Sequence, residues 1–167
     1  MIRASNSYLK MKNYFEDLAS KSVHVKSFAG YFQRELVTLD SGDQLQSPYL
    51  AVFDYQLGLS GPEQNTISVR KIKFAIMYKN LPEDNLAAQY LAIDNAEAII
   101  LKFLSRIKMD SYKEDHFLYQ AFRKENSKIT PVELSINSFG AEVSLEFQNN
   151  QTLGVKQEDW TDTYTTC

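Results

Sequence analysis

The stretch Glu83–Lys108 constrains the fold more than any other, because its apolar residues recur with the period of an α-helix. One apolar row comprises Leu86, Tyr90, Ile93, Ile100, Leu104 and Ile107, and a second comprises Ala96, Ile99 and Phe103. Pro82 is expected just before the helix or in its first turn, where its missing N–H costs nothing. Acidic residues stand at the start and basic residues near the end, as the helix dipole favours. A buried face of this width predicts a sheet beneath the helix.

Composition supports that sheet and argues against one class of partner. The chain has 167 residues, which suits a single domain. Its aromatic share of 13%, with ten Tyr and ten Phe, favours strands. The formal net charge is −3, so the chain lacks the basic field with which a dedicated nucleic-acid-binding protein collects phosphates. Nucleic acid is therefore not an expected partner.

The cysteine count and the distribution of apolar residues indicate where in the cell the protein is expected. The single cysteine, Cys167, has no second cysteine for an internal disulfide and cannot build a metal site alone. The first fifteen residues lack the apolar core of a signal peptide. The sequence also contains no run of about 18 apolar residues, the length needed to span a membrane. We expect a soluble cytoplasmic protein with no membrane partner.

The first forty residues predict one helix and one mixed segment. Residues 6–20 form an amphipathic pattern, with Ser5 or Asn6 as the capping residue. Its apolar positions are Tyr8, Met11, Phe15 and Leu18. In residues 22–40, Val23 and Val25 alternate as in a short strand, whereas Phe28, Phe32 and Leu36 have helical spacing. We therefore predict a segment that mixes strand and helix.

Two long strands are predicted next. In the first, one face carries Tyr49, Ala51, Phe53, Tyr55, Leu57 and Leu59. The second strand runs over residues 66–79, and its apolar residues change parity, from odd numbers at Ile67 and Val69 to even numbers from Ile72 onward. Because a register slip of one residue moves side chains to the other face, we predict a β-bulge near Arg70-Lys71.

Three further strands are predicted after the long helix. They are Phe117–Phe122, Pro131–Ile136 and Phe139–Gln148, of which the last has the clearest alternation. Asn137-Ser138 is the predicted hairpin turn, with Ile136 paired with Phe139 and Val132 opposite Val143.

These elements predict an α+β fold with a mainly antiparallel sheet of about four to five strands. An N-terminal helix and one long central helix pack on the sheet. Residues 1–148 form the predicted domain. In residues 149–167 apolar residues thin out and no period survives, so this segment is predicted to be a flexible polar tail.

The sequence presents no recognisable catalytic set. The sharpest candidate metal site is Asp110, Glu114, Asp115 and His116, for which a solvated turn is the preferred interpretation. Ser7-Tyr8-Leu9-Lys10 and Ser105-Arg106-Ile107-Lys108 match the loose S-x-x-K pattern, but the companion motifs of serine acyltransferases are missing. We therefore predict a protein that is not an enzyme and has no cofactor or metal.

Five residues are candidates for partner binding. Arg70, Lys71 and Lys73 place positive charge on the second long strand, where a solvated strand edge is the alternative interpretation. Trp160 and Tyr164 give the predicted tail two aromatic side chains that can anchor it on a neighbour. The alternative is that Trp160 rests on its own domain.

The order of elements carries a resemblance. A leading helix is followed by Ser47-Pro48-Tyr49-Leu50 at the start of a strand, then by the strand Ile72–Tyr78 and a long helix that opens with acidic residues. The closing strand reads F-G-x-x-V-x-L-x-F from Phe139 to Phe147. This arrangement resembles the small tail-completion or tail-terminator-like subunits of bacteriophages, prophages and related contractile injection structures.

The resemblance implies an α+β subunit that forms a homo-oligomeric ring at the end of a tail tube. Its partners would be copies of itself and tail tube or sheath proteins, and it would end up in a virion or injection particle. The alternative is a monomeric soluble binding module with a pocket between sheet and central helix, and an enzyme of unrecognised type is a third hypothesis.

Overall fold

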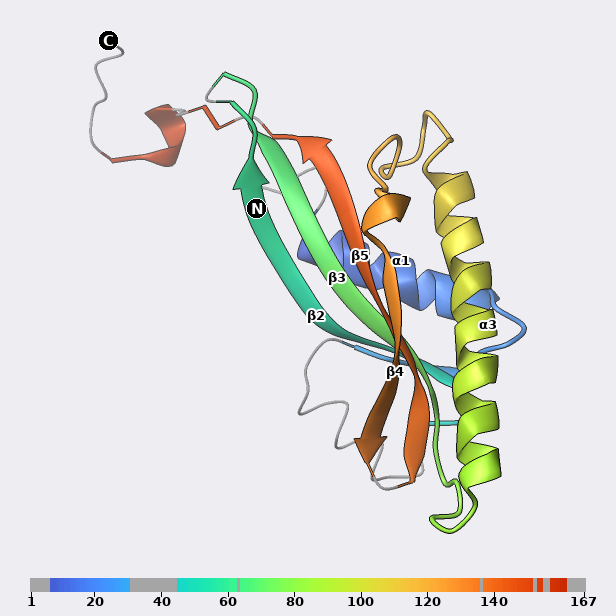
Figure 1. The fold of residues 1–167 in the computed structure, drawn as a ribbon. Coiled ribbons are helices and arrows are strands. Elements are labelled where there is room, and N and C mark those ends of the chain that lie inside the picture. The colour runs from blue at the N-terminus through green and yellow to red at the C-terminus, as the bar shows by residue number, and fades with distance from the viewer. Residues whose placement is uncertain are drawn as a thin grey trace.

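The computed structural model describes residues 7–30, 45–62, 64–135, 137–151, 153–154 and 157–161. The order of elements is α1 (Tyr8–Lys21), β1 (Ser27–Ala29), β2 (Tyr49–Ser60), β3 (Ile67–Tyr78), α3 (Leu86–Asp110), η1 (Lys124–Asn126), β4 (Lys128–Ser135), β5 (Ser138–Asn150) and η2 (Gln157–Asp159). The described strands form one sheet in the order β1-β2-β3-β5-β4, antiparallel except for the β1–β2 pair. The predicted α+β class is confirmed (Figure 1).

Helices α1 and α3 lie on the same face of the sheet and enclose what we call the helix-side core (Figure 1). Its centre is an aromatic row in which the Phe15 ring of α1 is 5.3 Å from the Phe74 ring of β3. The Phe103 ring of α3 is 6.0 Å from Phe74 on the other side. Phe74 of the central strand thus lies beside both helices, while α3 also packs on β5 and α1 also packs on β1 and β2.

Helix α1 starts at Tyr8, so neither Ser5 nor Asn6, the predicted capping residues, is its N-cap. The hydroxyl of Ser7 accepts a hydrogen bond from the Lys10 N–H at 3.2 Å, which makes Ser7 the N-cap. The predicted apolar face is otherwise observed, since Met11, Phe15 and Leu18 are buried.

Helix α3 starts at Leu86 with Asn85 as its cap, so Pro82 precedes the first turn. The predicted apolar row was wrong at its start, because Leu86 and Tyr90 are 59% and 68% exposed. The buried face instead runs through Gln89, Ala92, Ala96, Ile99, Ile100, Phe103 and Ile107. The Gln89 amide donates to two carbonyls of the preceding loop, which satisfies a buried polar group at this end of the helix.

The irregularity that we predicted in β3 lies in β2. Strand β3 pairs with β5 without any shift, whereas the β2–β3 register shifts between Val52 and Asp54. Phe53 is thus the extra residue of the bulge, and β2 changes face there. Tyr49 and Ala51 point into a second core on the opposite side of the sheet, while Tyr55 packs against the helix-side core. The predicted single apolar face of β2 was therefore wrong.

The second core explains why the odd- and even-numbered apolar residues of β3 led to the wrong prediction of a bulge. Ala75 and Met77 are buried on the opposite side while Phe74 and Ile76 are buried on the helix side. The second half of β3 is therefore buried on both faces, a pattern that needs no bulge.

Two further predictions in the second half of the chain were wrong. Residues 117–121 are turns, and Phe122 makes one isolated bridge with Phe147. In the hairpin, Val132 pairs with Gly140, because the register differs from the predicted one. Val132 then packs on the opposite side from Val143.

Candidate functional site

The outer half of β2 is an open sheet edge. Strand β1 pairs with β2 at Tyr49, Leu50 and Ala51 alone. From Asp54 to Ser60, β2 is paired with β3 on one side, and no described strand lies on its other side. Alternate residues of such an edge direct their N–H and C=O groups outward, where another strand can bind them.

Beyond the bulge at Phe53 and the carboxylate of Asp54, this edge carries few of the features that protect an edge strand against pairing. The segment from Asp54 to Ser60 contains no lysine, arginine or proline. The other edge of the sheet is the shorter β4, which carries Lys128, Pro131 and Glu133. The difference makes β2 the edge that is suited to accept a strand.

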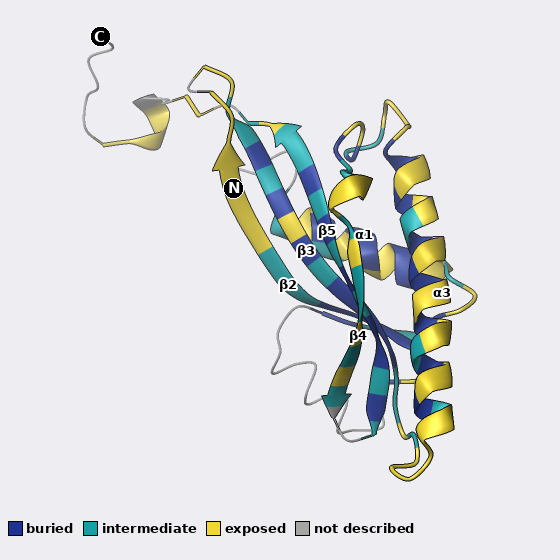
Figure 2. Cartoon of the chain, in the orientation of Figure 1, coloured by how far each residue is buried: buried dark blue, intermediate teal, exposed yellow. Residues whose placement is uncertain are grey.

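Two leucines add an apolar surface to the open edge. Leu57 and Leu59 are 54% and 55% exposed, and the outer part of β2 is drawn as exposed in Figure 2. Leu57 pairs with Arg70 and so lies on the helix-bearing face of the sheet. Because the Gln151 N–H donates to the Thr66 carbonyl, the chain leaves β5 at this same end of the sheet.

Among the predicted partner-binding residues, Arg70 lies on the opposite face of the sheet from Lys71 and Lys73. Arg70 is 2% exposed on the helix-bearing face. Lys71 is exposed, and Lys73 lies 3.8 Å from Glu142, both on the opposite face. Trp160 is 54% exposed, and Tyr164 lies outside the described residues.

Arg70 is a buried cation with neutral partners. Its Nε donates to the Tyr55 hydroxyl at 3.2 Å, and its Nη1 donates to the Ser68 hydroxyl at 2.7 Å. Among the described residues, no carboxylate forms an ion pair with it. It therefore cannot act as the exposed charge that the sequence led us to expect.

The most heavily hydrogen-bonded charge is Asp110, which the sequence placed in a candidate metal cluster. Asp110 is 2% exposed at the end of α3. It accepts hydrogen bonds from the Tyr14 hydroxyl at 3.0 Å, Arg106 Nε at 3.0 Å and Lys113 Nζ at 2.7 Å. These contacts join α1 to the end of α3 and occupy the carboxylate with protein donors.

The pKa values in this cluster follow from burial and hydrogen bonding. Burial alone would raise the pKa of Asp110, but the hydrogen bonds from Lys113, Arg106 and Tyr14 outweigh it and lower this pKa below its ordinary value. Burial, followed by the charge and hydrogen bond of Asp110, raises the pKa of Tyr14. The site holds an ionised carboxylate beside a neutral phenol.

The other members of the predicted metal cluster are dispersed. Glu114 and Asp115 are exposed, and His116 accepts the Leu118 N–H with Nδ1. Burial lowers the pKa of His116. Across the part of the chain that the structure describes, no three His, Cys, Asp or Glu side chains are placed to share a metal ion.

The serines of the two S-x-x-K patterns have structural hydrogen bonds. Ser7 caps α1, and the Ser105 hydroxyl donates to the Leu101 carbonyl at 2.8 Å. Neither arrangement sets a serine beside a general base.

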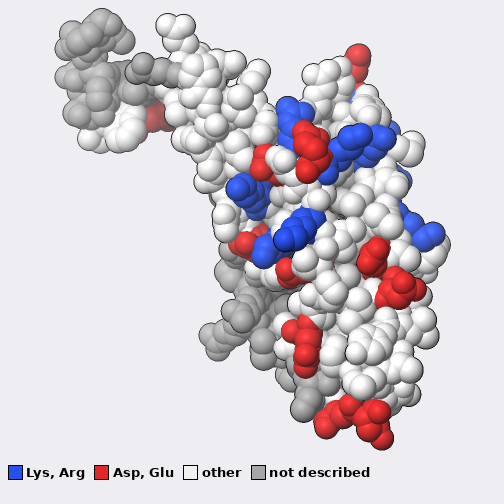
Figure 3. Space-filling view, viewed as in Figure 1, with Lys and Arg blue, Asp and Glu red and all other residues white. Residues whose placement is uncertain are grey.

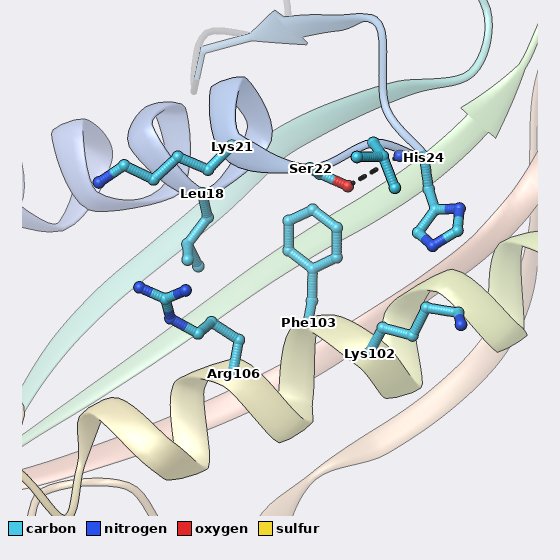
Figure 4. Close-up of a pocket in the computed structure, with 8 residues that line it drawn as sticks. Leu18, Lys21, Ser22, His24, Lys102, Phe103 and Arg106 are labelled. Carbon is cyan, nitrogen blue, oxygen red and sulfur yellow. Dashed lines mark hydrogen bonds between the residues drawn. The ribbon is translucent and has the colours of Figure 1, made fainter.

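In the part of the chain that the structure describes, two pockets lie among helices and loops. One, of about 250 Å³, lies between the end of α1 and the second half of α3 (Figure 4). It is lined by Leu18, Lys21, Ser22, Val23, His24, Lys102, Phe103 and Arg106. The other, of about 340 Å³, is lined by Lys108, Ser111, Tyr112, Gln120, Phe122, Arg123, Lys124 and Glu125. Sequence reasoning missed both: the first joins residues about 80 positions apart, and the second lies within residues 108–125, where a polar turn and a strand were predicted.

No described helix has the length and apolarity needed to cross a membrane. The chain matches no protein-family model and no curated protein.

Proposed function

We propose that this protein is a non-enzymatic structural subunit that assembles with copies of itself through the open edge of β2. The observation that carries the proposal is the open edge from Asp54 to Ser60 with its two exposed leucines. Strand addition to such an edge supplies main-chain hydrogen bonds, and neighbouring apolar side chains supply buried area. The half-exposed Trp160 is a second candidate anchor for a neighbouring subunit.

The charge distribution favours a head-to-tail contact between copies. Residues 80–101 contain four acidic residues (Glu83, Asp84, Asp94, Glu97) and no basic residue, a net charge of −4. Residues 102–113 contain Lys102, Arg106, Lys108 and Lys113 against Asp110, a net charge of +3. On the face drawn in Figure 3, the basic side chains lie in the upper and middle part together with acidic ones, and the lowest part carries acidic side chains alone. Heterologous contacts of this kind build rings when they close.

The resemblance extends the proposal to a particular assembly. A ring-forming α+β subunit at the end of a tail tube, in a phage or a derived contractile injection particle, is the function that it implies. Tail tube or sheath proteins would then be the other partners.

The test compares two double variants that replace leucine with glutamine and leave the net charge unchanged. Leu57→Gln/Leu59→Gln alters the open edge, and Leu91→Gln/Leu101→Gln alters exposed leucines of α3, which are 59% and 51% exposed. Sedimentation velocity should show oligomers for the wild type and the α3 variant but monomers for the edge variant. Circular dichroism melting should be similar for all three, since the replaced side chains are largely in water.

Two results would overturn the proposal. One is a wild-type protein that sediments as a monomer at every concentration. The other is equal association of the edge variant and the α3 variant, which would place the contact elsewhere.

The alternative function, a monomeric binding module, would need a different pocket from the one that the sequence predicted. The predicted pocket between sheet and α3 is occupied by packed side chains, since Ile100, Phe103 and Ile107 are at most 5% exposed. A module of this kind would use one of the pockets among helices and loops instead.

A further inference from the structure

The pocket between α1 and α3 has features of a ligand site that are independent of assembly. Its floor is apolar, because Leu18 and Phe103 are each 5% exposed and belong to the helix-side core. Its rim is basic, with Lys21, Lys102 and Arg106 as charged residues. Among the described residues, no Asp or Glu lines it. An apolar floor with a few polar groups at the rim is the usual composition of a small-molecule site.

The basic rim is only partly neutralised. Lys21 Nζ is 2.7 Å from Asp17 and so has a counter-ion on its own helix. Arg106 and Lys113 share the single carboxylate of Asp110, which leaves this group of three with a net charge of +1. Among the described residues, no carboxylate forms an ion pair with Lys102. Net positive charge therefore remains at the pocket.

Asp110 also orients Arg106 for binding. It accepts from Nε, and no hydrogen bond from either Nη group to a described residue is present. In Figure 4 the Phe103 ring stands between Arg106 on one side and Lys102 with His24 on the other. A guanidinium held through Nε presents its two remaining nitrogens as a fork, the geometry that pairs with carboxylate or phosphate oxygens.

We propose that this pocket binds a small organic anion, with an apolar body against Leu18 and Phe103 and a carboxylate or phosphate at Arg106 or Lys102. The volume of about 250 Å³ lies just below the range of drug-sized sites, so the ligand is small. The site would act in addition to the assembly surface on β2, which lies on a different element.

The test titrates ¹⁵N-labelled full-length protein with four probes and follows amide resonances by NMR. The probes are phenyl phosphate, benzoate, inorganic phosphate and benzyl alcohol. Phenyl phosphate or benzoate should give saturable shifts at Val23, His24, Lys102 and Phe103, and whichever binds more tightly identifies the head group. Inorganic phosphate and benzyl alcohol should bind more weakly, because each offers one half of the recognised chemistry.

Matched variants separate the site from general charge attraction. Lys102→Gln should weaken the tighter probe by up to about fivefold, the loss expected for one exposed charge pair. Lys71→Gln makes the same change in net charge on the opposite face of the sheet and should leave the affinity unchanged.

Three results would overturn the proposal. They are the absence of saturable shifts with both organic anions at millimolar concentration, equal weakening by the two lysine-to-glutamine variants, and binding of benzyl alcohol as tight as that of the tighter of the two anions. None of them bears on assembly, which the leucine variants test separately.

Discussion

Removing the Asp110 carboxylate should destabilise the fold by an amount that its partners determine. Tyr14 is 8% exposed, so in Asp110→Ala its hydroxyl loses its acceptor in a buried setting, at about 1–3 kcal/mol. The side chains of Arg106 and Lys113 are 49% and 48% exposed and can return to water, so each pair contributes about 1 kcal/mol or less. The expected loss in the free energy of unfolding is about 2–4 kcal/mol.

A second substitution tests that reasoning. If the stranded Tyr14 hydroxyl is the main cost, adding Tyr14→Phe to Asp110→Ala should restore part of the lost stability. Tyr14→Phe alone should cost about 1 kcal/mol, because it removes one hydrogen bond and leaves Asp110 with two cations. Urea denaturation followed by circular dichroism gives all four free energies, provided that the m-value stays constant.

The same carboxylate predicts a pH dependence. The pKa of Asp110 in the folded protein is lowered, so on acidification the unfolded chain takes up a proton before the folded one does. The stabilisation is therefore complete above the unfolded value of about 3.9 and is lost as pH falls through the folded pKa. The difference between wild type and Asp110→Ala should accordingly shrink below about pH 4. A variant within about 0.5 kcal/mol of wild type at neutral pH, or no rescue by Tyr14→Phe, would refute this account.

Two further predictions concern the sheet. Gly140→Ala should lower the free energy of unfolding by more than about 2 kcal/mol, because an added Cβ would lie 2.0 Å from the Ile76 carbonyl oxygen. Gly58→Ala is the control in the same urea titration, since its added Cβ would meet nothing closer than 3.8 Å. Ile72→Asp should prevent folding because Ile72 is 1% exposed in the helix-side core, whereas Ile67→Asp, on the other face near the end of β3, should still give a dispersed NMR spectrum. Equal sensitivity of the two isoleucines would contradict the observed register.

Periodicity was enough for the fold class and for most elements. The long helix was found because its apolar spacing persists over about six turns, and β5 was found because Ala141, Val143, Leu145 and Phe147 alternate with polar residues. Such patterns reflect one buried face per element. They fail where an element has two buried faces or changes face, as the second half of β3 and the bulge at Phe53 do.

The functional features were harder to predict because they depend on what lies beside a residue. The sequence around Arg70 indicates a charged strand edge, but Tyr55 and Ser68 provide it with a buried site. The open edge of β2 is not encoded in β2 itself, since it arises because β1 spans three residues. The pocket between α1 and α3 joins side chains about 80 positions apart, so no local sequence motif predicts it.

The lengths of α3 and β3 are matched, and this determines how the chain returns to the sheet. Twenty-five helical residues rise about 37 Å, and the twelve residues of β3 extend about 41 Å. The β3–β5 ladder joins residues 61 positions apart at one end (Tyr78 and Phe139) and 83 apart at the other (Ile67 and Asn150), whereas β2–β3 and β4–β5 are local hairpins. Closing that long loop carries the largest entropic cost among the antiparallel pairings of the sheet. Because 25 of the intervening residues form the rigid helix α3, the length of this helix fixes the distance that the chain spans between the two hairpins.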